Sequence, residues 1–381
     1  MEITTYSSIW FRDKSIPVIR ARDLANSHTF SLATPVIDTK ALKAREQYPK
    51  AWEILMNQVQ LFKIGSEIFC RDGSELHPLS DKPFLERLLV DGIDFKSGDK
   101  DITMPQKFAD LMLAKPPKEI PEVDFVAQFP VVTQSGHILS KGCKEGVLCL
   151  YGGPPLVVPE KPTEEEAKAA LLLIADEFMG ELPFDPPYHR NRAIAALLQS
   201  FVRPVINGAT PLYMFTAPKG GTGKSLLAKC IAQILSGDDG HEVDFEKSKR
   251  EREEEVVTAL NESAVAIIID NVDKPIKWAF LDKLLTSQVH RPRQKYTHRT
   301  KTLQNQALWM LTANAPKVFE DTARRTIEIH MDAKMENPRD RQGFKHNLET
   351  WVPEHRKELL EACITVVAYW VSLGGPIYDV P

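Results

Sequence analysis

One stretch of this chain constrains its fold more than any other: an apolar, aromatic run, then a glycine-rich turn, then a helix-forming run. The three parts are Pro211–Ala217, Pro218–Gly223 and Lys224–Leu235. Glycines let successive backbone N–H groups turn inward around an oxyanion, and the start of a helix adds a favourable field. This order predicts a phosphate-binding loop in an α/β domain with a parallel sheet.

The residues of this loop match the contacts that a nucleoside triphosphate needs. Lys224 is expected to reach the β- and γ-phosphates and the Ser225 hydroxyl to bind Mg²⁺, so ATP and Mg²⁺ are the expected cofactors. The first glycine of the motif is replaced by Pro218. The expected nucleotide-binding residues are Lys219, Gly220, Gly221, Thr222, Gly223, Lys224, Ser225 and Leu226.

A second apolar run, 264–269, ends in the acidic side chain of Asp270. A carboxylate at the end of a strand beside a phosphate loop is where Mg²⁺ is held, so Asp270 joins Ser225 as an expected metal ligand. The next residue is Asn271, where many ATPases have a glutamate. An amide cannot take a proton from water, so Asn271 could only orient it, and Asp273 or a carboxylate elsewhere could be the base. The sequence leaves the base open.

A third apolar run, Ala307–Ala313, ends at Asn314, and the pair Arg324 and Arg325 precedes a further strand, Thr326–Met331. Taken alone, an asparagine after a strand is usually a turn residue, and paired arginines are usually solvated. In this order after the phosphate loop, Asn314 is expected to hold the attacking water or the γ-phosphate. The arginines are expected to offset the charge of the transition state.

The rest of the chain divides by texture. Residues 1–150 are predicted to form an N-terminal α+β accessory domain, with strands at Ile64–Cys70 and Phe125–Val132 and hairpins over 136–150. A proline-rich linker and a helical collar are expected over 151–204. Their first helix is capped by Thr163 with Glu166 and their second ends before Pro204. An ATPase core over 205–332 and a helical lid over 333–381 complete the predicted order.

Composition excludes several classes of protein. Of 381 residues, 43% are hydrophobic and 26% charged, as in ordinary soluble globular proteins. The longest uncharged apolar runs fall far short of the ~20 residues of a membrane span. The five cysteines form no Cys-x-x-Cys pair, and no secretory signal is visible at the start. We therefore do not expect a membrane protein, a secreted protein or a zinc protein. The expected location is the cytoplasm of a bacterial, archaeal or virus-infected host cell.

Charge is distributed unevenly despite a net charge of only −4. The window 283–319 holds seven Lys and Arg residues and no Asp or Glu, and it lies between the Asp270 and Asn314 strands. A basic loop with an aromatic residue suits a sequence-independent grip on a nucleic-acid backbone, although a basic run can also be a solvated face. The expected DNA-binding residues are Arg291, Arg293, Lys295, Tyr296, Arg299 and Lys301.

Taken together, these motifs resemble those of the AAA+ ATPases, and most of all the helicase modules of phage and mobile-element primase–helicases. Those modules are relatives of the superfamily 3 and poxvirus-type primase–helicases. The resemblance covers 205–330 and 333–374, and less specifically 60–200, whereas residues 1–57 match no family. The resemblance rests on the motifs at Ala217–Ser225, Ile269–Val272, Asp321–Arg325, Arg341–His346 and Trp351–Arg356.

The resemblance implies an AAA+ P-loop ATPase that assembles into a homo-oligomeric ring, with six subunits expected, and moves on single-stranded or forked DNA. Arg324 or Arg325 would then act on a neighbour's nucleotide. Replication of a phage, plasmid or integrated element is the expected role, and replication proteins are further expected partners. A nucleotide-switched loader or assembly ATPase is the alternative, and Asn271 favours its slow turnover. A protein-remodelling ATPase fits the basic window less well.

The basic window generates a prediction of its own. Reversing Arg293, Lys295 and Arg299 to Glu should remove stimulation of ATP hydrolysis by DNA but leave basal hydrolysis, because phosphate contacts act through charge. DNA affinity measured at moderate salt checks this. An unchanged affinity in the triple variant would contradict the assignment of the window to DNA.

Overall fold

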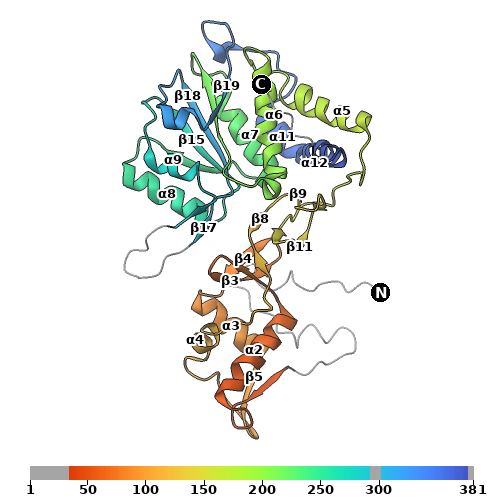
Figure 1. Cartoon of the computed structure of the whole chain (residues 1–381), viewed down its shortest axis with the longest axis vertical. Helices are drawn as coiled ribbons and strands as arrows, with labels where there is room; N and C mark the ends of the chain where they lie inside the picture. The colour runs from red at the N-terminus through yellow and green to blue at the C-terminus, as the bar shows by residue number, and fades with distance from the viewer. Residues whose placement is uncertain (1–33, 292–301, 376–381) are drawn as a thin grey trace. The chain divides into compact units, whose positions relative to one another are not determined.

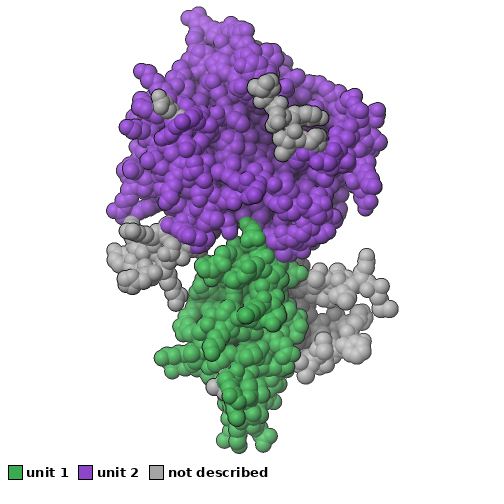
Figure 2. All heavy atoms as spheres, in the orientation of Figure 1, with its two compact units in different colours: residues 1–124 green, residues 125–381 purple. Residues whose placement is uncertain are grey.

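The structure, a computed structural model, describes residues 34–291 and 302–375, and its elements are drawn in Figure 1. The chain forms two compact units, Met1–Asp124 and Phe125–Pro381, which Figure 2 colours separately. The distribution of apolar and turn residues along the sequence predicted that the N-terminal domain ends at residue 150. The structure moves this boundary to 124/125, because Phe125, Phe129 and Val131 are buried in the hydrophobic cluster of the larger unit.

The smaller unit has its own core of buried side chains, which includes Trp52, Leu55, Leu85 and Phe108. One sheet has the strand order β4-β3-β2-β7 and another the order β1-β5-β6. The elements are β1 (Val36–Asp38), α2 (Ala44–Gln58), β2 (Gln60–Ile64), β3 (Glu67–Asp72), β4 (Glu75–Pro78), α3 (Lys82–Gly92), β5 (Asp94–Ser97), β6 (Lys100–Asp101), α4 (Phe108–Leu113) and β7 (Glu122–Val123).

Two predicted strands are broken in the structure. The strand expected over Ile64–Cys70 is wrong as a single element, since β2 ends at Ile64 and β3 begins at Glu67 in an antiparallel pair. Gly65 has a φ of 60° in the turn between them, a backbone conformation that glycine adopts without steric cost. The run Phe125–Val132 also divides, into β8 (Phe125–Ala127) and β9 (Val131–Val132).

The larger unit begins with short strands and helices that precede the main sheet. The pairing of β11 with β12 confirms the hairpin expected before residue 150. These elements are β10 (Ile138–Leu139), β11 (Gly142–Lys144), β12 (Val147–Cys149), α5 (Glu164–Leu172), the π-helical turn η2 (Leu173–Phe178), α6 (Tyr188–Phe201) and the 3-10 turn η3 (Arg203–Val205).

A five-stranded sheet in the order β14-β15-β18-β13-β19 forms the centre of this unit, and every neighbouring pair is parallel. Alternation of strands and helices produces this arrangement, as predicted. The remaining elements are β13 (Leu212–Ala217), α7 (Lys224–Ser236), β14 (His241–Asp244), α8 (Lys249–Asn261), β15 (Ala266–Val272), α9 (Ala279–Leu284), β16 (Val289–His290), β17 (Leu303–Gln304), β18 (Leu308–Asn314), α10 (Glu320–Ala323), β19 (Thr326–His330), the 3-10 turn η4 (Pro338–Asp340), α11 (Leu348–Glu354) and α12 (Arg356–Ser372).

Helices cover both faces of this sheet, so its central strands are apolar on both sides. On one face, α6, α7, α11 and α12 pack in a single cluster with Phe215, Ile268 and Met310. On the other face, α8 and α9 pack with Ile267 and Ile269, and Figure 1 shows these two helices on the opposite side of the strands from α7. Side chains at alternate strand positions therefore face either α7 or α8.

The helix after the proline-rich segment begins as the sequence predicts. Thr163 accepts a hydrogen bond from the Glu166 backbone N–H (3.2 Å), and the Glu166 carboxylate accepts one from the Thr163 N–H (2.7 Å). The proline-rich segment itself lies within the larger unit, where Leu156 and Val158 pack against its core. It is therefore part of that unit rather than a connection between domains.

Replacing Thr163 with Ala should lower the free energy of unfolding by about 1 kcal/mol, because the Glu166 backbone N–H loses the side-chain oxygen that accepts its hydrogen bond. In a unit of this size that is a fall in melting temperature of about 2–4 °C. Thr163→Ser keeps the hydroxyl and should melt like the wild type. Equal melting of the Ala and Ser variants would contradict the assigned cap.

Candidate functional site

The strands of the parallel sheet end at one edge, and the glycine-rich loop lies there between β13 and α7. Gly221 and Gly223 have φ values of 81° and 93°, in the left-handed region that favours glycine. Gly223 immediately precedes the first residue of α7, so the loop delivers its N–H groups at a helix start. The predicted strand–loop–helix order is confirmed by the structure.

Lys224 is almost fully buried, with a relative exposure of 7%. Its ammonium donates a hydrogen bond to Asn314 Oδ1 (2.9 Å) and a longer one to Thr222 Oγ1 (3.4 Å). Burial lowers the pKa of Lys224 from its ordinary value, and the negative charge of Asp270 opposes that shift. Lys224 of α7 and Asn314 of β18 are therefore in contact, and the order of the motifs in the sequence predicted that these two residues lie close together.

A second contact joins the loop to the acidic strand. The Ser225 hydroxyl donates to Asp270 Oδ1 at 2.6 Å, and the Thr312 hydroxyl donates to the same carboxylate oxygen. Thr312 Oγ1 also accepts the backbone N–H of Asn271 at 2.9 Å. Thr312 was not among the predicted residues, although a single hydroxyl inside the apolar run of β18 is a signal that could have indicated it.

The donor set at Ser225 and Asp270 fits a magnesium ion. Hydroxyl and carboxylate oxygens are the hard ligands that Mg²⁺ takes, and it usually keeps water and substrate phosphates as its other ligands. Within 34–291 and 302–375, no group of three or more His, Cys, Asp or Glu side chains could hold a metal ion. Ser225 and Asp270 would therefore hold the ion together with phosphate oxygens rather than as a closed protein cage.

Asn271 and Asp273 lie at the same end of β15. Asn271 is exposed with a φ of 52°, and the register of β15 with β18 shifts at this point. Val272 returns to the cluster on the α8 face, and Asp273 is exposed beyond the strand end. Positive φ is uncommon for residues other than glycine, and asparagine tolerates it better than most. Neither residue has a described contact with Lys224 or Ser225.

Arg324 and Arg325 lie at the other edge of the sheet. The Arg325 carbonyl accepts the N–H of Leu212, the first residue of β13, whereas the glycine-rich loop follows the last residue of that strand. At ~3.3 Å per residue, β13 separates the two by roughly 16 Å. Both guanidinium groups pair with Asp321, and the Arg324 side chain is 73% exposed. The pair therefore does not reach Lys224 of its own chain.

The segment after β19 lies against the glycine-rich loop. A Cβ added to Gly221 would lie 2.4 Å from Cγ of Arg339, and Lys219 Nζ donates to the Glu336 carbonyl at 3.0 Å. Within the described residues, Arg339 forms no ion pair with a carboxylate. Sequence analysis missed Arg339, because its place beside Gly221 depends on how the chain returns after β19.

The expected DNA-binding residues are only partly described. Arg291 is exposed directly after β16, whereas Arg293, Lys295, Tyr296, Arg299 and Lys301 lie outside the described residues. The described strands on either side, β16 and β17, pair antiparallel. Asn305, which follows β17, is buried and donates to the carbonyls of Leu284 (2.7 Å) and Ser287 (2.9 Å). These hydrogen bonds tie the residue after β17 to the segment that precedes β16.

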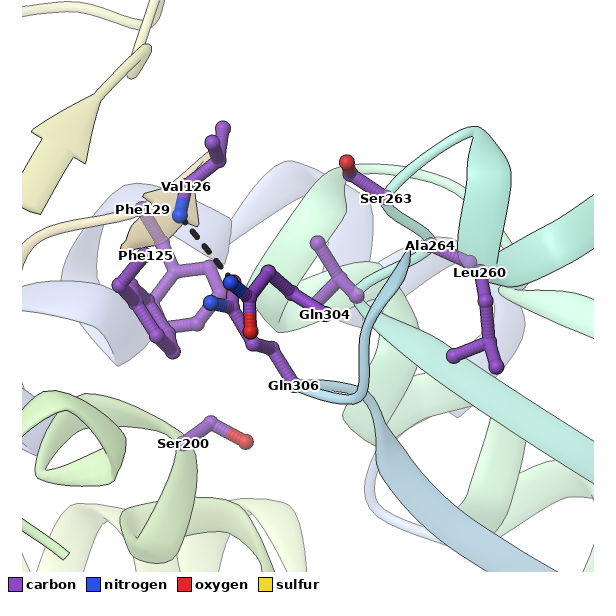
Figure 3. A pocket seen from close by; sticks show the side chains of 10 residues that line it. Phe125, Val126, Phe129, Ser200, Leu260, Ser263, Ala264, Gln304 and Gln306 are labelled. Atoms are coloured by element: carbon purple, nitrogen blue, oxygen red, sulfur yellow. Dashed lines mark hydrogen bonds between the residues drawn. The ribbon is translucent and has the colours of Figure 1, made fainter. Parts of the chain in front are cut away.

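A small pocket lies away from the phosphate loop, where β15 and β18 begin. Phe125, Phe129, Ala264, Gln304 and Gln306 are among its lining residues, and Figure 3 shows the Gln306 side chain directed toward the backbone of Val126. Gln306 Oε1 accepts the Val126 N–H at 3.1 Å. This pocket contains none of the predicted site residues.

Comparisons with solved structures find alignments at low sequence identity. No protein-family model and no curated protein matches the chain. The apo NrS-1 C-terminal region aligns at 14% identity with a TM-score of 0.46, over 83% of this chain and 68% of that one. JCV helicase aligns at 14% identity and a TM-score of 0.28, over 54% of this chain and 61% of that one. SCCmec type IV Cch, described as an active helicase, aligns at 15% identity and a TM-score of 0.33, over 81% of this chain and 57% of that one.

The helices of the described residues were compared with the length and polarity that a membrane span requires. Across 34–291 and 302–375, every helix is too short or too polar to cross a bilayer.

Removing the buried ammonium of Lys224 should increase the stability of the folded protein. Desolvation places its folded-state pKa below the unfolded value, so the charged form costs free energy at neutral pH, and this cost shrinks as pH rises toward the unfolded value. Lys224→Met should therefore melt higher than the wild type at pH 7, by about 2–4 °C for each kcal/mol of relieved cost. The difference should narrow at high pH.

Lys229, on the same helix, is the matched control. It donates to Glu242 at 3.1 Å, and this hydrogen bond raises its pKa. Lys229→Met should therefore show no increase in melting temperature. A Lys224→Met protein that melts below the wild type would contradict the desolvation argument.

Proposed function

We propose that this chain is an ATP-hydrolysing P-loop ATPase of the AAA+ type that acts on DNA as a ring-forming helicase or translocase. The proposed setting is replication of a phage, plasmid or integrated mobile element. The observation that supports this most directly is the convergence of β13, α7, β15 and β18 at one edge of the sheet. There Lys224, Ser225, Asp270 and Asn314 are joined by hydrogen bonds of 2.9 Å and 2.6 Å.

Each of these side chains suits one requirement of phosphoryl transfer. The Lys224 ammonium offsets charge on the β- and γ-phosphates, and backbone N–H groups of the loop donate hydrogen bonds to the phosphate oxygens. Ser225 and Asp270 hold the magnesium ion, which when bound neutralises charge on the β- and γ-phosphate oxygens. Asn314, whose amide oxygen contacts Lys224, orients the water or the γ-phosphate. Thr312 fixes the carboxylate of Asp270.

Two arginines extend the proposed site in different ways. Arg339 lies beside Gly221 of its own chain, where its guanidinium can add positive charge to the phosphates. Arg324 lies at the opposite edge of the sheet, so it can act only on the nucleotide of an adjacent subunit. Its pair with Asp321 is exposed, and such pairs contribute little stability, so the guanidinium is available for a second partner. A closed ring supplies that neighbour to every subunit.

The DNA part of the proposal rests on the basic sequence window. Within this window, β16 and β17 pair antiparallel, and the buried amide of Asn305 donates to the Leu284 carbonyl. A basic segment with an aromatic residue suits a grip on phosphates, with Tyr296 stacking on a base. The alternative function is a nucleotide-switched loader that binds DNA without unwinding it, and Asn271, an amide where many ATPases have a glutamate, favours that reading.

The test uses three proteins and a mixture of two of them. Lys224→Ala should abolish ATP hydrolysis, and Arg324→Ala should lower it by about 10³-fold or more, as for other arginines supplied in trans. Mixing the two variants should restore part of the activity, because the Lys224→Ala subunit supplies the missing arginine. Arg250→Ala, which removes an exposed arginine paired with Glu254 on α8, is the control and should stay active.

Strand displacement on a forked duplex separates the helicase from the loader. Wild-type unwinding that requires ATP supports the helicase, whereas DNA-stimulated hydrolysis without displacement supports the loader. Full ATPase activity in Lys224→Ala would rule out the assigned site. Absence of any rescue in the mixture would argue against completion by a neighbouring subunit.

A further inference from the structure

The acidic strand end at Asp270 has a second carboxylate beside it on the next strand. β14 pairs parallel with β15, and Asp244 is the register partner of Asp270. Neighbouring strands lie ~4.8 Å apart, and paired residues of a parallel ladder project to the same face. Asp244 therefore lies one strand spacing from Asp270, at the same edge of the sheet.

Burial patterns identify which face this is. Val243 and Phe245, on either side of Asp244, are buried in the cluster with α8. Ile268, two residues before Asp270, is buried in the cluster with α7. Asp244 thus projects to the α7 face, because alternate strand positions face opposite sides.

A contact two residues earlier on β14 supports this orientation. Glu242, on the same side of the strand as Asp244, pairs with Lys229 of α7 at 3.1 Å. The face that carries Glu242 and Asp244 is therefore the face on which Ser225 contacts Asp270 at 2.6 Å. The Asp244 carboxylate is exposed, and its Oδ1 accepts the Glu246 backbone N–H at 2.9 Å, which fixes its orientation.

We propose that Asp244 is the catalytic base of this ATPase, a role that Asn271 cannot fill because an amide does not accept a proton from water. This inference rests on the proposed ATPase function. In the step, the water oxygen forms a bond to the γ-phosphorus and the bond from that phosphorus to the β–γ bridging oxygen breaks. The electron pair leaves with ADP. Asp244 takes the proton from the attacking water and then passes it to solvent.

Asp273 is the competing carboxylate. It follows Val272, which is buried on the α8 face, and it lies beyond the strand end after the register shift. Asp244 instead lies within the regular ladder, directly beside the metal-binding carboxylate. The base is thus supplied by the neighbouring strand rather than by the residue that follows Asp270.

The experiment compares Asp244→Asn with Asp273→Asn and Glu242→Gln. Asparagine at 244 keeps the acceptor for the Glu246 N–H, so the turn after β14 is preserved. Asp244→Asn should lower kcat by 10²-fold or more, as expected for loss of a general base. The Kd for a fluorescent ATP analogue should stay within about threefold of wild type, and KM should not rise. Asp273→Asn and Glu242→Gln should keep kcat within about threefold, with all melting temperatures compared.

The outcomes separate the two claims. A Lys224→Ala protein that loses turnover beside an active wild type supports the proposed ATPase function. Given that result, Asp244→Asn with near-normal kcat overturns Asp244 as the base, and loss of kcat in Asp273→Asn instead transfers the role. Loss of analogue binding in Asp244→Asn also overturns Asp244 as the base, because a general base acts in the chemical step and is not needed to bind the nucleotide. A wild type that neither binds nor hydrolyses ATP overturns the proposed function itself.

Discussion

The arrangement depends on one constraint: all five strands of the central sheet are parallel, so their carboxyl ends lie at the same edge. Side chains from segments far apart in the sequence therefore meet at this edge. The glycine-rich loop brings a helix start to this edge, and the buried Lys224 ammonium joins it to β18 through Asn314. Ser225 makes the corresponding link to β15 through Asp270. Strand direction therefore brings together the residues of the proposed phosphate- and cation-binding site.

Arg339 and the Arg324–Arg325 pair lie at opposite edges of the sheet. Arg339 returns to Gly221 in its own chain, whereas the carbonyl of Arg325 pairs with the start of β13. The proposed site at one edge and the exposed arginine at the other are consistent with the proposed ring, in which each subunit would complete the site of the next. Desolvation lowers the pKa of Lys224, which the proposed site needs in its charged form, so the residue that would serve function lowers stability. Active sites commonly carry such local costs.

Much of the larger unit could be predicted, because its signals are local. The apolar runs became β13, β15, β18 and β19, and the Thr163–Glu166 capping box is as expected. The smaller unit was harder, since short strands with mixed polarity lack a strong period. The turn at Gly65 broke a predicted strand, and residues 125–150 joined the larger unit through buried aromatic side chains that the turn-rich texture did not indicate.

The sequence alone determined the order of the phosphate loop, the acidic strand, Asn314 and the arginine pair, since each motif is read from neighbouring residues. Only the tertiary structure decided which side chains meet. It put the Thr312 hydroxyl on the Asp270 carboxylate, Arg339 beside Gly221, and Asp244 next to Asp270 on the face toward α7. The physical reason is that strand order and register in a sheet depend on packing between distant segments, which no local pattern of residues encodes.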